Sequence, residues 1–507
     1  MSIAKQSADE PSAEPDPRRW RALSVTLTAG FMSLLDVSIV AVALPSIQQD
    51  LATDAAGVQW VVSGYALTFG LALVPAGRVG DAMGRRRMFL LALAGFVLCS
   101  ALAGMAPTIG LLIAARLAQG LTAGALAPQN SALIQSLFRG AERGRAFGLF
   151  GATVGISTAV GPVVGGVLLA LAGGPAGWRW IFLVNVPVGV VALVLAARLL
   201  PRDRAAGARG HMDLVGVALL GAAVLAVLLP LVRASTGGLA QWWLFVVGAA
   251  LAAAFVAWEN RVVARGREPL LDPRLVRTTP GYASGATIGF TYFIGFSGIW
   301  IVLAVFFQAG LGYPPLWSGL AVTPFALGSA LSSALGGRLV ERHGRTLTVL
   351  GLVGVALGLA AVAVVLLLVP AASAGLAVAA PMLLAGIGGG LVISPNFTLT
   401  LRCVPVRSAG SAGGALQTGQ RIGAAVGTAG LAGLFYATLA GTGGNYPVAV
   451  ATSLGGALVP MLVALALAVR DRRRRPDRGP TPNRPRRTPT TPDPALIRPG
   501  SAPDPER

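Results

Sequence analysis

Charged residues are scarce in this chain of 507 residues: they make up 12%, whereas hydrophobic residues make up 54%. A soluble domain carries about 25% charged residues, so the charge present here is too little to cover a water-exposed surface. The mean hydropathy is +0.70. These figures exclude a soluble enzyme or a nucleic-acid-binding domain as the main body of the chain. They indicate a helical protein that crosses a membrane many times.

Cysteine and histidine are nearly absent as well. Cys99 and Cys403 are expected toward opposite membrane faces, so they should not form a disulfide. His211 and His343 fall in expected cytoplasmic loops, which leaves no histidine relay across the membrane, and we expect no cofactor and no bound metal. The chain contains no G-x-x-x-x-G-K-[ST] phosphate-binding loop, which argues against an ATP-driven pump. The first 19 residues are polar and lack the apolar core of a cleavable signal peptide.

Long apolar runs are what the sequence does contain. Fourteen runs approach the ~20 residues that cross a ~30 Å hydrocarbon core. They span 22–44, 58–77, 88–106, 109–134, 146–171, 180–199, 214–232, 243–259, 283–308, 316–337, 347–369, 376–400, 412–438 and 447–469. The sequence therefore predicts an all-α membrane protein with 14 transmembrane helices. The two middle runs, 214–232 and 243–259, match least well.

The basic residues predict how the chain is oriented. Most of the 40 Lys and Arg residues fall in the two tails and in alternate connecting segments. Cytoplasmic segments are enriched in Lys and Arg, so both termini are expected in the cytoplasm of a bacterial cell, with the chain in its inner membrane. The tail after Arg470 is rich in Arg and Pro, and we expect it to be disordered, either solvated or against anionic headgroups.

A short loop sequence occurs twice and indicates a duplicated plan. GRVGDAMGR at 77–85 returns as GRLVERHGR at 337–345, and each copy joins two apolar runs on the expected cytoplasmic side. A six-helix unit is therefore repeated, with two extra central helices between the copies. The expected parts are a cytoplasmic tail (1–19), an N-terminal half (20–200), a two-helix insertion (201–280), a C-terminal half (281–470) and a cytoplasmic tail (471–507).

Asp36 is the one acidic residue, of 20, that lies well inside an apolar run. Arg116 in the fourth run lies at a similar depth, so an ion pair between the two is geometrically allowed. A buried carboxylate is costly and needs a partner or a task. The pair either aids packing or couples transport to a proton that Asp36 binds and releases.

The repeated loop is the second candidate site. Its glycines permit a tight turn and close helix approach, and Asp81 can accept hydrogen bonds at a helix N-terminus. The loop either closes the cytoplasmic side or is an ordinary basic turn. The residues assigned to this gate are Gly77, Asp81, Gly84 and Arg85 in the first copy and Gly337, Glu341, Gly344 and Arg345 in the second.

Two further features concern helix packing and a cavity. In the fifth run, small residues permit close helix contact and a proline can kink the helix; they are Gly151, Gly155, Gly161, Pro162, Gly165 and Gly166. In the ninth run, four aromatic residues are expected on one face, where they line a substrate cavity or serve plain packing; they are Phe293, Phe296, Trp300 and Phe307. Arg421 has no acid at its depth and is expected to bind substrate charge or backbone carbonyls, or to be structural.

Several of these segments together resemble the fourteen-helix drug:proton antiporters of the major facilitator superfamily, the EmrB/QacA type. The resemblance covers about 20–470 and rests on LDVSIVAVALP (35–45), GRVGDAMGRRR (77–87), RLAQG (116–120), GISTAVGPVVGG (155–166) and WRWIFLVNVPVG (178–189). It implies proton coupling at Arg116 and an antiporter motif in the fifth helix. Three departures are Ala82, where a basic residue often follows Asp81; Glu341, which stands in the second loop where the first copy has Asp81; and the lack of an acid in 316–337, which makes dicationic substrates less expected.

The resemblance implies a proton-coupled exporter and not an enzyme. It would work by alternating access and exchange lipophilic drug-like molecules or antibiotics for protons, with the lipid bilayer and no nucleic acid as its surroundings, and with a monomer as one candidate state. Two alternatives remain open: an exporter of an endogenous amino acid, sugar or siderophore, and a membrane sensor that transports nothing.

Overall fold

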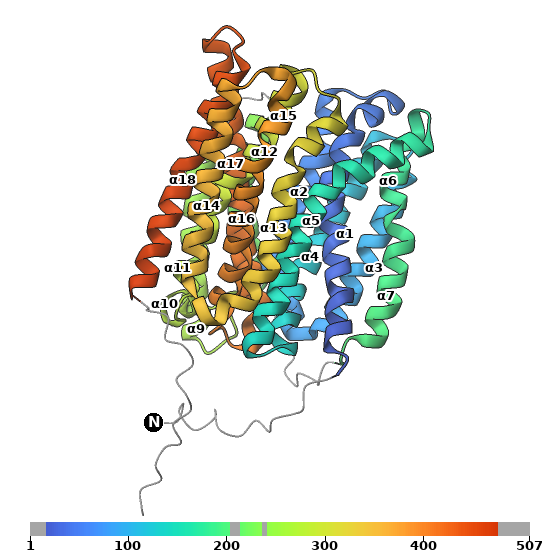
Figure 1. The fold of residues 1–507 in the computed structure, drawn as a ribbon. Helices are drawn as coiled ribbons and strands as arrows, with labels where there is room; N and C mark the ends of the chain where they lie inside the picture. Colours follow the sequence, from blue (N-terminus) through green and yellow to red (C-terminus); the bar gives the residue numbers. More distant parts are fainter. Residues whose placement is uncertain (1–16, 203–212, 236–240, 475–507) are drawn as a thin grey trace, which may run out of the picture.

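The computed structural model describes residues 17–202, 213–235 and 241–474, and within these ranges the regular structure is helical. The helices stand side by side in one bundle (Figure 1). Those of the first half lie on the right of the view and those of the second half on the left. Helix α1 begins and α18 ends at the same, lower end of the bundle, which we call the basic end because it carries the two Arg-rich loops.

The first half runs from α1 to α7, with a short 3₁₀ turn η1 before α6. The bounds are α1 Arg19–Asp50, α2 Ala55–Met83, α3 Arg85–Gly104, α4 Ile109–Leu137, α5 Gly140–Ala172, η1 Pro175–Trp178, α6 Arg179–Leu183 and α7 Asn185–Leu199. Helix starts at Asp54 and Thr108 are capped in the expected way, since each side chain accepts a backbone N–H of the first turn.

The insertion contains α8 Leu214–Ser235, α9 Trp243–Ala264 and the short α10 Arg274–Thr278. The helix α9 continues past the expected end at residue 259. Glu259, which the sequence placed at a helix end, therefore lies inside α9, and its side chain is 0% exposed. Asp36 is therefore not alone as an acid buried within a helix, contrary to the expectation. The expectation took the end of the apolar run as the end of the helix, whereas α9 extends beyond that run.

The second half repeats the plan of the first. Its elements are α11 Tyr282–Ser297, α12 Ile299–Val305, η2 Phe306–Gly310, α13 Pro315–His343, α14 Arg345–Leu368, η3 Ala371–Ser373, α15 Ala374–Ala377, α16 Ala379–Leu401, η4 Val406–Ser408, α17 Ala409–Gly441 and α18 Tyr446–Arg474. The element η2 is one turn of π-helix. A helix of 20 or more residues at 1.5 Å per residue matches the thickness of a bilayer core.

Thirteen helical segments of the described residues are long and apolar enough to cross a membrane. The expected fifth span falls in α5, which has 33 residues, but only Val163–Ala172 of it appears as a shorter apolar stretch. The all-helical membrane fold is thus observed, whereas the number fourteen stays a prediction.

The two halves meet near the basic end. The large core of the second half extends to Leu23, Ile134, Phe138 and Phe147 of the first half, all near the basic ends of their helices. Phe397 of α16 lies within 6.1 Å of the Phe147 ring. Farther from the basic end, α5 contacts α1 of its own half: Gly161 of α5 lies against Ser38 of α1. The structure therefore shows a conformation that is closed at the basic end.

Candidate functional site

Asp36 of α1 and Arg116 of α4 form a buried ion pair between Asp36 Oδ2 and Arg116 Nη1. Their side chains are 0% and 1% exposed. Two more side chains complete the contact: Gln119 accepts from Arg116 at 2.8 Å and donates to Asp36 Oδ1 at 3.1 Å, and Asn185 of α7 donates to the same oxygen at 3.3 Å. Both carboxylate oxygens of Asp36 are therefore satisfied, as a buried charge requires.

Aromatic rings cover the arginine of this pair. The Arg116 guanidinium carbon lies 4.2 Å from the centre of the Tyr65 ring and 5.5 Å from that of Phe182. Arg116 Nε also donates to the backbone oxygen of Val61 at 3.0 Å. Cation–π contacts of this kind gain strength where water is excluded. The guanidinium is thus held by a carboxylate, an amide, a carbonyl and two rings.

Asp81 in the first loop caps a helix of the other half. Its carboxylate accepts the backbone N–H groups of Gly410 at 3.0 Å and Ser411 at 2.9 Å, at the start of α17. The positive end of a helix dipole favours a negative charge there. This is the type of contact that the sequence predicted for Asp81, and the structure identifies α17 as the helix.

Arg85 ties the same loop to two other segments. It donates to the backbone oxygens of Ala132 at 3.1 Å and of Val406, and it lies 3.4 Å from Asp81. The loop between α2 and α3 turns at Gly84, whose φ of 103° only glycine adopts readily. A charge-assisted bond to a carbonyl is stronger than a neutral one, so Arg85 links α3 to α4 and to the segment before α17.

Glycines bring α2 and α17 into backbone contact. A Cβ added at Gly77 would lie 2.3 Å from the Gly410 oxygen, and one added at Gly414 would lie 2.4 Å from the Leu73 oxygen. Any larger residue at these positions forces the two helices apart. The sequence GRVGDAMGR thus provides both the close approach and the capping acid.

The second loop copy repeats the glycine contact but not the ion pair. A Cβ added at Gly337 of α13 would lie 2.3 Å from the Gly144 oxygen of α5, and Gly344 has a φ of 47°. Glu341 is exposed, and Arg345 bonds instead to Asn396 at 2.7 Å and to Asp471 at 2.9 Å. Among the described residues, the carboxylate that pairs with Arg345 is therefore Asp471 of α18, whereas in the first copy Asp81 of the loop itself pairs with Arg85.

Arg143 is a further link between the halves that the sequence analysis did not assign. At the start of α5 it donates to the backbone oxygens of Gln135 and Phe138 at 3.3 and 3.1 Å, and to that of Arg402 at 3.4 Å. Burial, followed by the nearby Arg139 and Arg402 charges, lowers the pKa of Arg143. A signal was present in the sequence, since Arg143 lies in the first turn of α5 and Arg407 lies just before α17.

The glycines of α5 contact two different helices. Gly155 lies against Ser329 of α13, with an added Cβ 3.3 Å from its hydroxyl, whereas added Cβ atoms at Gly161 and Gly165 would meet Ser38 and Ile39 of α1. Gly166 has nothing within 4 Å, so its expected packing role is wrong. Adjacent residues on a helix point about 100° apart, and Gly165 already faces α1. The helix continues through Pro162, whose side chain lies outside the described part.

Three of the four ninth-run aromatics line one small cavity. Phe293, Phe296 and Trp300 surround it together with Phe325 of α13, and the Trp300 and Phe325 rings are 4.8 Å apart. Gly155 of α5 and neighbouring residues close the cavity from the first half. Its volume is about 80 Å³, well below the ~300–1,000 Å³ of drug-sized sites. In this conformation the cavity is nearly closed.

Phe307 does not belong to this face, contrary to the expectation. It is fully buried and stacks on Tyr313 at 5.6 Å. The helix is interrupted between Ser297 and Ile299, and the π-turn η2 begins at Phe306. A π-turn contains an extra residue, which rotates Phe307 away from the line of Phe293, Phe296 and Trp300.

Arg421 of α17 lies against the first half and does not line the aromatic cavity. Its guanidinium carbon is 4.3 Å from the centre of the Phe69 ring of α2. Phe69 in turn lies 6.1 Å from Tyr65, the ring that covers Arg116. A row of two aromatic rings therefore connects Arg421 with the Asp36–Arg116 pair.

The comparisons with known proteins agree with this architecture. Residues 26–212 and 285–501 match the family model of the Major Facilitator Superfamily. The chain belongs to the Major Facilitator Superfamily. It is therefore a multi-pass membrane transporter and not an enzyme. The interval that the family model leaves out, 213–284, includes the insertion helices α8 and α9.

Several relatives within the superfamily are drug-resistance proteins or antibiotic transporters by name. The chain is 37% identical over 465 residues to the puromycin resistance protein pur8 of Streptomyces alboniger, covering 90% of this chain and 89% of the relative. It is 36% identical over 439 residues to a probable actinorhodin transporter of Streptomyces coelicolor, covering 85% and 75%. The multidrug resistance protein Stp of Mycobacterium tuberculosis is 35% identical over 420 residues, covering 81% and 75%.

Solved structures of the superfamily share the fold at low identity. The human organic anion transporter MFSD10 superposes with a TM-score of 0.64 at 16% identity, covering 89% of this chain and 100% of that one. The proton:xylose symporter XylE superposes with a TM-score of 0.61 at 13% identity, covering 88% and 94%. These likenesses support the fold of this superfamily member.

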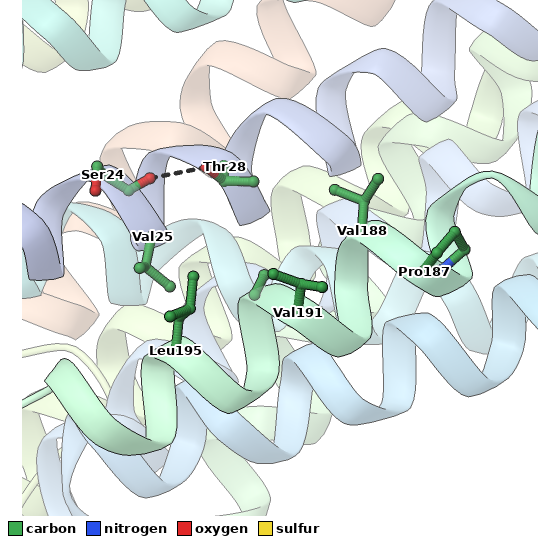
Figure 2. A pocket seen from close by; sticks show the side chains of 8 residues that line it. Ser24, Val25, Thr28, Pro187, Val188, Val191 and Leu195 are labelled. Atoms are coloured by element: carbon green, nitrogen blue, oxygen red, sulfur yellow. Dashed lines mark hydrogen bonds between the residues drawn. The ribbon is translucent and has the colours of Figure 1, made fainter.

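A groove on the outside of the first half is separate from all predicted site residues. It runs between α1 and α7 and is lined mainly by apolar side chains, with Ser24 and Thr28 on α1 (Figure 2). Thr28 donates to the backbone oxygen of Ser24 at 2.9 Å, so the polar groups are satisfied within the helix. Val191 and Leu195 on α7 are exposed, as side chains that face lipid are. We assign no transport role to this groove.

Three residues of the Asp36 network were missed by sequence reasoning, and a signal for two of them was available. Gln119 and Asn185 are polar residues inside apolar runs, like Asp36 and Arg116, and the search considered only charged side chains. Tyr65 carried no such signal, because an aromatic ring inside an apolar run is typical of packing. Only its place under Arg116 distinguishes it.

Proposed function

We propose that this protein exports lipophilic drug-like molecules across the bacterial inner membrane in exchange for protons. The relatives named for puromycin and multidrug resistance support drug export. The buried pair of Asp36 and Arg116 carries the proposal of proton coupling. Both termini and both repeated loops would lie on the cytoplasmic side, so that the basic end is the cytoplasmic end. The parts would be two six-helix halves, 20–200 and 281–470, that move about the cavity.

The proton step follows from the contacts of Asp36. As long as Arg116 is in place, the carboxylate has a counter-charge and two amide donors. A rotation of α1 against α4 that separates the two charges would leave a buried carboxylate without a cation. Such a carboxylate takes up a proton rather than remain charged. The protonated state then belongs to one orientation of the halves and the ionised state to the other.

The gate follows from the contacts at the basic end. Asp81, Arg85 and Arg143 each bond to the opposite half in the described conformation. These bonds would have to break for the protein to open toward the cytoplasm and to admit cargo. We therefore assign Asp81 and Arg85 to a cytoplasmic gate, with Arg143 as an additional member.

The test is transport into everted membrane vesicles from a host that lacks its own drug pumps. In these vesicles the cytoplasmic face points outward, so an acidic lumen should drive the uptake of a fluorescent cargo while protons leave the lumen. We expect uptake that an uncoupler abolishes and that adding ATP does not restore. Uptake at the same rate with and without a proton gradient would refute proton coupling. Export of amino acids, sugars or siderophores in place of drugs would support the metabolite alternative.

A further inference from the structure

The insertion covers the seam where the two halves meet. Helix α8 packs against α2 and α17 together: Leu228 of α8 lies in one apolar cluster with Leu67 of α2 and Ile422 of α17. A Cβ added at Gly70 of α2 would lie 3.2 Å from the Leu228 side chain. A second cluster joins Phe255 of α9 to Val74 of α2, which lies seven residues before the capping acid Asp81. The insertion thus contacts the elements that form the gate.

Two carboxylates lie side by side where α8 and α9 approach the basic end. Glu259 of α9 is 0% exposed, and neither of its carboxylate oxygens has a hydrogen-bond partner in the described part of the chain. A Cβ added at Gly216 would lie 2.5 Å from Glu259 Oε1 and 2.7 Å from Asp213 Oδ2. The two oxygens therefore flank the same point, and only glycine leaves room for them there.

Asp213 is better supplied with hydrogen-bond donors than Glu259. The indole N–H of Trp258 lies 3.0 and 2.9 Å from the two Asp213 oxygens, and the Gly216 N–H donates to Oδ1 at 2.9 Å. The backbone N–H groups of Leu270 and Leu271 lie near Glu259. Among the described residues, the charged side chain that faces Glu259 is Asp213.

The other charges of this region are engaged elsewhere. Arg78 of α2 bonds to Glu268, in the segment that follows α9, and Arg261 on the same helix as Glu259 is exposed. Neither of these two arginines therefore neutralises the Asp213 and Glu259 carboxylates. A carboxyl group that is buried beside a second carboxylate favours its neutral form, so Glu259 is the group that retains a proton here.

We propose that Glu259 binds a proton and donates it in a hydrogen bond to Asp213, as a second proton-binding site apart from Asp36, and that this proton holds α8 and α9 together over the seam. With the proton, the two carboxyl groups share a hydrogen bond. Without it, two adjacent negative charges push the helices apart. The insertion then loosens its cover on α2 and α17. The inference stands independently of the proposed cargo and of the role of Asp36.

Infrared difference spectroscopy of the purified full chain tests the proton directly. A buried, protonated carboxyl gives a C=O stretching band that shifts in D₂O. We expect such a band in the wild-type protein, its loss in Glu259→Gln, and its retention in Asp36→Asn. A spectrum in which Glu259→Gln removes no protonated-carboxyl band would overturn the proposal.

Hydrogen–deuterium exchange of α8 tests the consequence. After correction for intrinsic rates, wild-type protection should fall as the pH rises, by up to about tenfold per pH unit for one linked proton. In Glu259→Gln the amide can donate to Asp213 at every pH, so protection should stay high and flat. Glu268→Gln, which changes a nearby exposed acid, should keep the wild-type slope. The same slope in wild type and Glu259→Gln, or protection that follows Na⁺ or K⁺ and not pH, would overturn the proposal.

Discussion

At the scale of residues, the Asp36–Arg116 pair places two opposite charges inside the bundle, where burial of each charge is costly. Both side chains are removed from water, and they are stabilised by each other and by neighbouring groups that include Gln119, Asn185 and Tyr65. Breaking a buried pair by removing one partner typically costs about 3–5 kcal/mol, whereas replacing both partners is often neutral. This asymmetry separates a structural role of the pair from a role in transport.

We expect Asp36→Asn to abolish transport driven by a pH gradient. Asparagine has the shape of aspartate but carries no proton that it can exchange, so the cargo step loses its coupling. The measurement is gradient-driven uptake in everted vesicles, at matched protein levels. Asp50→Asn is the matched control, because Asp50 lies on the same helix and pairs with Arg179 at the other end of α1. Normal antiport by Asp36→Asn would exclude Asp36 from the mechanism.

The double variant Asp36→Asn/Arg116→Gln separates the two roles of the pair. We expect Asp36→Asn alone to lower thermal stability, since it leaves the buried Arg116 charge without a carboxylate. Replacing Arg116 as well removes that charge and should restore most of the stability. Coupling should remain absent. Recovery of both stability and coupling in the double variant would show that the pair only serves packing.

At the scale of elements, the contact between α2 and α17 depends on backbone proximity. The glycines at 77, 410 and 414 let the helices touch, and Asp81 then reaches the N–H groups at the start of α17. The capping bonds exist only while the basic end is closed. An interaction made in one state alone shifts the balance between states by its own free energy, on the order of 1–3 kcal/mol for such couplings.

We therefore expect Asp81→Asn to open the basic end and to slow transport roughly tenfold, as a shift of about 1.4 kcal/mol would. A cysteine at Ser131, which lies beneath Gly413 in this contact, reports the opening through its labelling from the cytoplasmic side. Cys99 and Cys403 are first replaced by serine. Glu341→Gln, the same kind of change at the exposed acid of the second loop, should have little effect. Equal labelling and equal rates in both variants would mean that the first loop only sets the topology.

At the scale of the whole molecule, the cavity determines which cargo fits. The aromatic cavity of about 80 Å³ is lined by Phe293, Phe296, Trp300 and Phe325 with aliphatic and small residues, and its described lining carries no charged side chain. Arg421 lies outside it, against Phe69. When the halves separate, the space next to these rings widens, while Asp36 is either paired with Arg116 or protonated. A dication would then meet no surplus negative charge, at a steep cost in a low dielectric.

Neutral or weakly acidic polycyclic compounds should therefore be exported better than bisquaternary ones. The measurement is a matched series of substrates that differ only in charge, tested for efflux in the same cells. Arg421→Ala should reduce the export of anions more than that of neutral compounds, because the variant removes a positive charge that can attract an anion. If the dication proves to be the best cargo, this account of the cavity is wrong.

The sequence by itself determined the membrane-spanning helical fold, the duplicated loops and the depth of Asp36 and Arg116. Length and apolarity decide these features, because a bilayer requires runs of about 20 apolar residues and penalises each buried charge. The sequence could also suggest that Asp81 caps a helix, since a carboxylate is favoured at any helix N-terminus. It could not say which helix, because the partner lies 329 residues away.

Only the tertiary structure decided how each helix is rotated toward its neighbours. That rotation brought Gln119 and Asn185 to Asp36, moved Phe307 off the aromatic face through a π-turn, and buried Glu259 beside Asp213. Lipid is as apolar as the side chains that it surrounds, so hydrophobic patterning does not show which face of a membrane helix packs inward. The faces are chosen by steric fit between small residues and by polar contacts across helices, which exist only once the bundle has assembled.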